Sequence, residues 1–295
     1  MRNLAQHPPE VAQESGDHTV IIMSHWRVMG ITVAGLIAVL VVLALLVRVI
    51  EPQFAFFPSA GEDVTPREFG TRFEALTIQT ADGERLHAWS FPVESPRAHI
   101  VYFHGNGGNL SVWAPILVPL PQRGYSLLAV DYRGYGLSTG RPSERGLYRD
   151  VDAVLDVVWR ERDPRAPIVY WGRSLGTTMA AYAASRKPPD RIILESGFPD
   201  AKTLVRSSPV LALLAFFSTY RFPTAELMAG VRAPVLVLHG DRDSVIPFDL
   251  GRALFDRIGG PKRFVTIRGG DHNDTAPRDA AAYWSAVDTF ISGEP

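Results

Sequence analysis

Two patterns of apolar and polar positions divide the chain. The first is the stretch Val28–Val47 (VMGITVAGLIAVLVVLALLV), which carries no charge and lies between Arg27 and Arg48. About 20 apolar residues span a bilayer as a helix. The apolar part of a signal peptide is usually about 7–15 residues long and precedes an A-x-A site, which is missing here. A core helix of this length normally has a polar face. Residues 28–47 are therefore predicted to be a transmembrane anchor, behind a polar, irregular tail at residues 1–27.

The second pattern begins at Phe73, where short apolar runs start to alternate with stretches that have apolar residues at helical spacing. It opens with a hairpin whose turn is Asp82-Gly83. The later alternation of strands and helices indicates a mostly parallel sheet covered by helices on both faces. The predicted strands are 73–79, 86–93, 99–103, 125–130, 168–171, 191–194, 235–239 and 265–267. The predicted helices are about 112–120, 148–159, the run after residue 174, and 280–291.

The segment between these patterns, residues 48–70, is predicted to be a linker that leads into an α/β domain at residues 71–295. Phe54, Phe56 and Phe57 lie at its start. Two interpretations are open for these aromatic side chains: they lie at the membrane surface, or they pack under the domain.

The composition excludes several classes of function. The chain has 295 residues and a formal net charge of −1, and its arginines are scattered, so no electrostatic argument favours nucleic acid. It has no cysteine, which rules out disulfides and thiolate metal sites. We expect a small-molecule or lipid substrate, a membrane contact through residues 28–47, and no metal or other cofactor.

A candidate nucleophile lies at the end of the strand 168–171. The sequence Gly172-Arg173-Ser174-Leu175-Gly176 places a serine between two glycines, after a β-rich run and before an Ala-rich helical run. This is the spacing of a nucleophile elbow, a sharp strand-to-helix turn that exposes the serine hydroxyl. Such a turn holds strained backbone, at a cost of about 1–3 kcal/mol. The alternative is a glycine-rich turn with a solvated serine.

A serine needs a base to remove its proton, and the base needs an acid to orient it. Candidates follow in the order Ser, Asp, His. Asp241 and Asp243 both lie in the loop after the strand 235–239, and His272 lies in the Gly-rich loop after the last strand. The other histidines lie in the tail, beside the anchor, in early strands or before glycines at strand ends. A metal site built from these three side chains fits no ligand spacing that we recognise.

The loop after His104 is a candidate oxyanion hole. Its sequence Gly105-Asn106-Gly-Gly leaves the backbone accessible, and we expect the N–H groups of Asn106 and Leu175 to bind the oxyanion. A phosphate-binding loop is the alternative, but no Lys-Ser/Thr follows. Asp131, at another strand end, is expected to tie the backbone of its own loop. Candidates for lining the substrate pocket are His104, Gly105, Tyr135 and Arg173.

Together these motifs resemble the α/β-hydrolase superfamily. HGNGGN, DYRGYGLSTG, GRSLG, HGDRDSVIP and GGDHN occur in that family's order between Phe73 and the C-terminus. The similarity points to membrane-anchored, single-domain serine hydrolases related to serine-aminopeptidase-like and lysophospholipase-like members. In this family the acid stands last in HG-x-x-D, which implies Asp243. Dehalogenases and epoxide hydrolases of the same fold have aspartate at the elbow, so Ser174 separates this chain from them.

Relatives insert a lid at the position of residues 198–228. Here the insertion is short, with an apolar centre at Val210–Phe217. Three interpretations are open: a small helix over an acyl-binding cleft, a second contact with the membrane, or ordinary core.

The sequence therefore predicts a membrane-anchored serine hydrolase acting on esters, thioesters or lysophospholipids. The alternatives are a peptidase of the same fold and, from another class, a non-catalytic binding module tethered to a membrane. Arg2 and Arg27 precede the anchor and Arg48 follows it, so the positive-inside comparison is nearly balanced. The short tail favours a single-pass protein of a bacterial inner membrane with its domain outside the cytoplasm.

Overall fold

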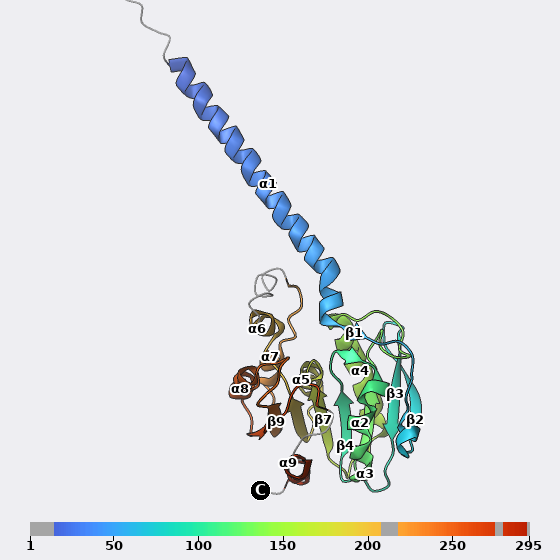
Figure 1. Cartoon of the computed structure of the whole chain (residues 1–295). Helices are drawn as coiled ribbons and strands as arrows, with labels where there is room; N and C mark the ends of the chain where they lie inside the picture. The colour runs from blue at the N-terminus through green and yellow to red at the C-terminus, as the bar shows by residue number, and fades with distance from the viewer. Residues whose placement is uncertain (1–14, 208–217, 275–279, 294–295) are drawn as a thin grey trace, which may run out of the picture. The chain divides into compact units, whose positions relative to one another are not determined.

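The computed structural model describes residues 15–207, 218–274 and 280–293 (Figure 1). The chain divides into two compact units, one ending at Val49 and one beginning at Ile50.

The described residues of the first unit all lie in helix α1, which begins at Ser15 and continues to Ala55 in the second unit. Residues 15–27 are thus helical, whereas the sequence pattern predicts an irregular tail there. From Trp26 to Gln53 the helix is long and apolar enough to cross a membrane. Most of its large apolar side chains are exposed, Ile31 among them at 74%, whereas Val47 is buried. Their exposure leaves this surface available to lipid.

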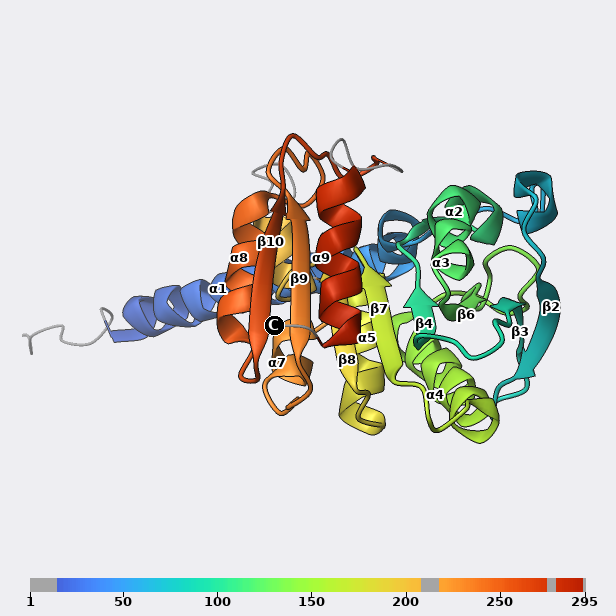
Figure 2. The same cartoon turned by 90° about the horizontal axis from the view of Figure 1, so that it is seen from below.

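The second unit is built on an eight-stranded sheet with the strand order β10-β9-β8-β7-β4-β6-β3-β2 (Figure 2). The β2–β3 and β3–β6 pairs are antiparallel and the other pairs are parallel. The mostly parallel sheet and the opening hairpin confirm the predicted topology. The strands are β2 Glu74–Gln79, β3 Arg85–Phe91, β4 His99–Phe103, β6 Ser126–Val130, β7 Ile168–Arg173, β8 Arg191–Glu195, β9 Val235–Gly240 and β10 Lys262–Ile267.

Helices cover both faces of this sheet, as predicted. Alternate side chains of the parallel strands point to opposite faces, so each strand contributes to two cores. One core packs against α4, α5, α7 and α8, and the other against α2, α3 and α9. The helices are α2 Leu110–Leu117, α3 Pro119–Gln122, α4 Glu144–Glu161, α5 Gly176–Arg186, α6 Ala201–Arg206, α7 Thr224–Met228, α8 Phe248–Arg257 and α9 Ala280–Ser292, with a 3-10 turn at Pro66–Phe69.

The predicted linker is largely part of the domain. Phe56 is buried in the core beside α4 and α5, with only 3% of its surface exposed. The next residues form strand β1 (Phe57–Pro58), which pairs in parallel with β5 (Gly107–Gly108). The backbone of this segment therefore joins a second, two-stranded sheet. Apolar periodicity cannot reveal such a pairing, because it is made by backbone groups.

The insertion predicted at residues 198–228 is described at both ends. Its first arm contains α6 and its second arm leads into α7. The apolar centre, Val210–Phe217, lies outside the described residues. The first arm follows the carboxyl end of β8, and open α/β sheets place their sites at the carboxyl ends of their strands.

Candidate active site

Ser174 lies at a strained turn between β7 and α5. Its φ is +55°, a left-handed conformation that is uncommon for a residue with a side chain. The positions of the flanking glycines have no room for a side chain. A Cβ on Gly172 would lie 2.1 Å from the Gly176 carbonyl oxygen, and one on Gly176 would lie 1.9 Å from the Phe103 carbonyl oxygen. The two glycines let strand and helix approach, and the turn points the hydroxyl away from the sheet.

The structure brings Ser174, His272 and Asp243 together. The His272 Nε2 lies 3.1 Å from Ser174 Oγ, and its Nδ1 lies 2.9 Å from Asp243 Oδ2. A carboxylate only accepts hydrogen bonds, so Nδ1 carries the proton and the Nε2 lone pair faces the serine hydroxyl. The three side chains are largely shielded, since none of these residues exposes more than 9% of its surface. This geometry fits a nucleophile, a base and an orienting acid.

Asp243 is held as a carboxylate. Burial by itself raises the pKa of this side chain, but the nearby imidazole of His239 and the hydrogen bonds from His272 and from the backbone N–H of Ile246 outweigh burial and hold the pKa below its usual range. The other carboxylate oxygen, Oδ1, accepts from the N–H groups of Val245 at 3.0 Å and Ile246 at 2.7 Å. Asp243 therefore stays ionised beside the imidazole.

Asp241, the other candidate acid, points elsewhere. Its Oδ1 accepts from the N–H of Gly269 at 2.6 Å on the exposed surface. It thus ties the loop of Asp243 to the loop that carries His272. Within the described parts of the chain, no group of three His, Asp or Glu side chains is arranged to hold a metal ion.

The loop after β4 lies against the nucleophile. A Cβ on Gly105 would lie 3.4 Å from the Ser174 Cβ. Within the described ranges, the backbone N–H groups of Asn106 and Leu175 donate no hydrogen bond to another protein group. The Leu175 N–H also lies at the N-terminus of α5, where the helix dipole favours negative charge. Two free donors next to the serine are what an oxyanion hole requires.

Two of the candidates for lining the substrate pocket, His104 and Tyr135, support this loop by hydrogen bonds to its carbonyl groups. The Nδ1 of His104 donates to the Gly105 carbonyl oxygen at 2.7 Å, and the hydroxyl of Tyr135 donates to the Asn106 carbonyl oxygen at 3.0 Å. Both side chains are fully buried. Because the C=O of Gly105 and the N–H of Asn106 belong to one planar peptide group, the His104 hydrogen bond also sets the direction of that N–H. His104 and Tyr135 therefore hold the loop from buried positions.

Asp131 ties the backbone of a neighbouring segment, whereas the sequence suggests that it ties its own loop. Its Oδ1 accepts from the N–H of Leu110 at 3.0 Å, which joins its loop to the start of α2. Its carboxylate also lies 3.5 Å from His104 and 3.6 Å from His87. Burial by itself raises the pKa of Asp131, but these two histidines outweigh it and lower the pKa. No contact links this carboxylate to His272 within the described residues.

Comparison with known proteins agrees with this architecture. A family model described as "alpha/beta hydrolase fold" matches residues 98–202. An uncharacterized protein of Mycobacterium tuberculosis is 34% identical over 244 residues, which cover 81% of this chain and 86% of that protein. Lysophosphatidylserine lipase ABHD12 of Macaca fascicularis is 34% identical over 224 residues, 68% of this chain and 55% of the lipase. The chain belongs to the α/β-hydrolase superfamily.

A solved structure shows the same fold. The Pyrococcus furiosus esterase Pf2001 superposes with a TM-score of 0.67 at 18% identity, covering 81% of this chain and 96% of the esterase. This likeness shows the fold, and the lipase among the relatives supports assigning this chain to the hydrolases.

Arg173, the residue before the nucleophile, holds the histidine loop of this hydrolase. Its Nη2 donates to the carbonyl oxygens of His272 at 2.7 Å and Asp274 at 2.9 Å. Its Nη1 lies 3.7 Å from the carboxylate of Glu195. Arg173 was a candidate for the substrate pocket, but the structure gives its side chain a supporting position.

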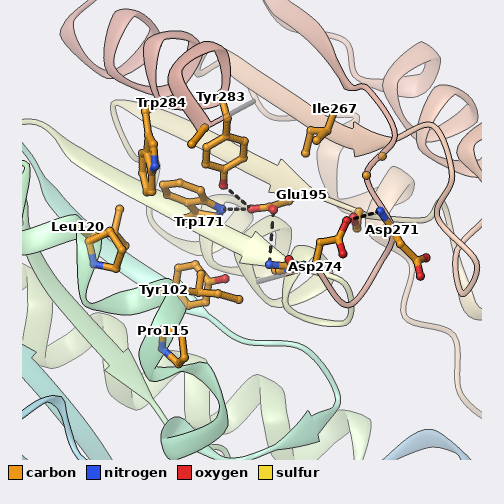
Figure 3. Close-up of a pocket in the computed structure, with 17 residues that line it drawn as sticks. Tyr102, Pro115, Leu120, Trp171, Glu195, Ile267, Asp271, Asp274, Tyr283 and Trp284 are labelled. Atoms are coloured by element: carbon orange, nitrogen blue, oxygen red, sulfur yellow. Dashed lines mark hydrogen bonds and ion pairs between the residues drawn. The ribbon is translucent and has the colours of Figure 1, made fainter. Parts of the chain in front are cut away.

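Glu195, at the end of β8, is a site residue that the sequence analysis missed. It accepts hydrogen bonds from Trp171 Nε1 at 3.2 Å and from the Tyr283 hydroxyl at 3.0 Å (Figure 3). These side chains line a cavity of about 140 Å³ that also borders the histidine loop. Arg173, and not Ser174, lines this cavity. A glutamate at a strand end carries no local motif, so only the fold reveals its partner.

His239 and Trp113 were also missed as parts of the site. The Nε2 of His239 donates to the Ile246 carbonyl oxygen at 2.9 Å and lies 3.4 Å from Asp243 Oδ2, so it braces the acid loop. The Nε1 of Trp113 donates to the Gly107 carbonyl oxygen at 2.9 Å. Its ring would lie 3.0 Å from a Cβ on Gly105, which places it beside the candidate oxyanion loop.

Proposed function

We propose that this protein is a membrane-anchored serine hydrolase that cleaves carboxylic esters or thioesters through an acyl-enzyme on Ser174. The observation that carries the proposal is the continuous hydrogen-bond chain from Ser174 Oγ through His272 to Asp243. Each member has the partner that its role needs, and the two free N–H groups of Asn106 and Leu175 lie beside the nucleophile.

Acylation follows from this geometry. His272 Nε2 takes the proton of Ser174 as Oγ attacks the carbonyl carbon of the substrate. Charge develops on the carbonyl oxygen, where the N–H groups of Asn106 and Leu175 are available to bind it. Loss of one such donor typically costs about 2.7–4 kcal/mol of transition-state stabilisation. The imidazolium then gives its proton to the leaving alcohol or thiol, and the acyl group stays on Oγ.

Deacylation repeats the sequence with water as the nucleophile. Neutral His272 takes a proton from water, which attacks the acyl carbon, and the proton passes to Ser174 Oγ as the bond to the acyl group breaks. Asp243 stays ionised throughout and stabilises the imidazolium in both halves of the reaction.

An acyl chain is the substrate feature that the surface favours. Three apolar side chains in or beside the loops of the site are exposed. They are Phe57 at 53%, Val112 at 57% and Val245 at 51%. A lysophosphatidylserine lipase among the relatives supports substrates with one acyl chain. We therefore propose single-chain lipids and long acyl esters or thioesters as the substrate class.

Membrane anchoring is supported by α1. Burying its exposed apolar side chains in lipid is favourable by about 25 cal/mol per Å², and the apolar stretch from Trp26 to Gln53 exceeds the length that a bilayer needs. Anchoring would keep the enzyme at the surface where acyl lipids are found.

The test is turnover of a chain-length series by the full-length protein in detergent. The series contains nitrophenyl esters, acyl thioesters and lysophospholipids, with aminoacyl and peptide anilides as the competing class. We expect hydrolysis of the acyl series that Ser174→Ala abolishes. Preferred cleavage of the anilides would replace the proposal with a peptidase, and a folded wild type that cleaves no substrate would contradict it.

A further inference from the structure

The candidate oxyanion loop is paired with the chain segment that begins at the last residue of α1. The N–H of Phe57 donates to the Asn106 carbonyl oxygen at 2.9 Å, and the N–H of Ser59 donates to the Gly108 carbonyl oxygen at 2.9 Å. These two bonds make a short parallel ladder between β1 and β5. We call Ala55–Ser59 the strap.

Side chains of the loop add to this ladder. The Nδ2 of Asn106 donates to the Ala55 carbonyl oxygen at 3.3 Å. The Nδ2 of Asn109 donates to the carbonyl oxygens of Gly61 at 2.9 Å and Ser59 at 3.4 Å, while its Oδ1 caps the first turn of α2. The loop is therefore fixed to the strap and its continuation at both of its ends.

The strap itself is fixed to the domain. The ring of Phe56 packs edge-on against Tyr220 at 5.4 Å and Phe222 at 6.1 Å between centroids. Just before it, the carboxylate of Glu51 accepts from the N–H of Thr219 at 3.0 Å. These partners lie in the described second arm of the insertion. The strap is thus a fixed support and not a free linker.

The loop needs such a support because of its composition. Three of the four residues Gly105–Gly108 are glycines, and Gly108 has φ of +79°, a left-handed conformation. Glycine loses more conformational freedom on folding than any other residue. Bare backbone can approach a substrate carbonyl, but it has few side chains to hold its own shape. The direction of the Asn106 N–H therefore depends on bonds made to neighbouring carbonyl groups.

We propose that the strap is a positioning element of the active site, whose N–H groups hold the oxyanion loop so that the Asn106 N–H points at the substrate oxygen. The proposal rests on the function proposed above. It assigns a catalytic support role to a segment that directly follows the membrane anchor in the chain. A hydrolase domain that lacks the strap would keep Ser174, His272 and Asp243 and lose turnover.

The test removes single N–H donors with proline in the full-length protein in detergent. Phe57→Pro and Ser59→Pro each delete one bond to the loop. Ala60→Pro is the matched control, because within the described residues the Ala60 N–H donates to no protein group. A soluble short-chain ester separates chemistry from lipid presentation. We expect kcat to fall at least about tenfold in Phe57→Pro and Ser59→Pro, since a lost oxyanion donor typically costs about 10²–10³ in kcat. We expect the KM and the melting temperature of these two variants to equal those of Ala60→Pro.

Asn109→Asp provides a test without a backbone change. Aspartate keeps an oxygen that caps α2 and loses the Nδ2 donor to Ser59 and Gly61. We expect its kcat to fall while KM stays unchanged, and this variant decides the matter if the proline variants are less stable than Ala60→Pro. Wild-type turnover that Ser174→Ala abolishes establishes the proposed function separately. If the wild type is active, either of two results would overturn the strap proposal. One is an Asn109→Asp variant with the kcat of the wild type. The other is a pair of variants, Phe57→Pro and Ser59→Pro, that are as active as Ala60→Pro. A wild type without turnover would overturn both.

Discussion

The guanidinium of Arg173 donates to the backbone carbonyl oxygen of His272, 2.7 Å away, so the residue before Ser174 holds the loop of His272. The same Nη2 also reaches the Asp274 carbonyl oxygen. Glu195 faces Arg173 from the end of the neighbouring strand. Ser174 and His272 belong to distant parts of the chain, and the buried Arg173 side chain joins the strand end before Ser174 to the His272 loop.

Replacing Arg173 by lysine tests this arrangement. Lysine keeps the positive charge beside Glu195, but a single ammonium cannot reproduce the planar fork of donors. We expect kcat to fall about 10–100-fold, the range in which a small misplacement of reacting groups lowers rate, with KM little changed. Steady-state kinetics on a soluble ester measure the effect. Wild-type kcat in Arg173→Lys would show that the His272 loop needs no support from this residue.

Removing the Arg173 charge is expected to destabilise the fold as well. Arg173→Met leaves Glu195 buried without a cationic partner, and breaking a buried pair in this way typically costs about 3–5 kcal/mol. A lower melting temperature in Arg173→Met than in Arg173→Lys would separate the role in stability from the role in positioning. Equal melting temperatures would mean that Trp171 and Tyr283 suffice to stabilise the Glu195 carboxylate.

Asp243→Asn tests the orienting acid. The amide offers Nδ2–H donors to the imidazole, which favours the tautomer with its proton on Nε2, where it cannot accept the Ser174 proton. A comparable change in a serine protease lowers kcat about 10⁴-fold, and we expect a loss of similar order. Asp241→Asn is the matched control, because Asp241 contacts Gly269 on the surface. A larger loss of kcat in Asp241→Asn than in Asp243→Asn would reverse the assignment.

The pH dependence of activity follows from the lowered pKa of Asp243. A lowered pKa means that the Asp243 carboxylate stays ionised as the pH falls through the usual range of aspartate, so the His272–Asp243 bond persists there. We expect the acid limb of log kcat/KM against pH to have a slope of one down to about pH 4, near the ordinary pKa of aspartate. A slope approaching two above that pH would show that Asp243 is protonated there and that its pKa is not lowered.

Membrane topology has a direct test because the chain contains no cysteine. A single cysteine at Arg165, whose side chain is 88% exposed, reports on the side of the membrane that the domain occupies. With the domain outside the cytoplasm, Arg165→Cys in intact spheroplasts should react with a membrane-impermeant maleimide. Full-length protein should also resist extraction by alkaline carbonate. Release by carbonate would contradict the anchor, and labelling only after lysis would reverse the orientation.

The parts of the site that follow strands were predictable from the sequence. Ser174, Asp243 and His272 each stand in a short motif with glycines, because a loop that reaches over the end of a sheet needs tight turns. The carboxyl ends of parallel strands share one edge, so the structure places these motifs side by side. Their catalytic roles remain predictions that the experiments above address.

The supporting contacts were not predictable. Phe57 bonds to the oxyanion loop through its backbone, and any residue except proline has that donor. Glu195 and Arg173 each lie at a strand end with no sequence signal of their pairing, which depends on the order of β7 and β8. The sequence allows the side chains of Phe54, Phe56 and Phe57 to lie either at the membrane surface or under the domain. Only the structure shows that Phe56 is buried. Sequence patterns indicate whether a side chain faces the core or the solvent. These contacts depend instead on which helices, strands and loops become neighbours in the fold.

The central claim is that Ser174 is an activated nucleophile. The direct measurement is labelling of the full-length protein by a fluorophosphonate probe, beside Ser174→Ala and His272→Ala, each with a melting temperature near that of the wild type. We predict stoichiometric labelling of the wild type on Ser174 and none in either variant. A folded wild type that stays unlabelled, or labelling that persists in Ser174→Ala, would contradict the account.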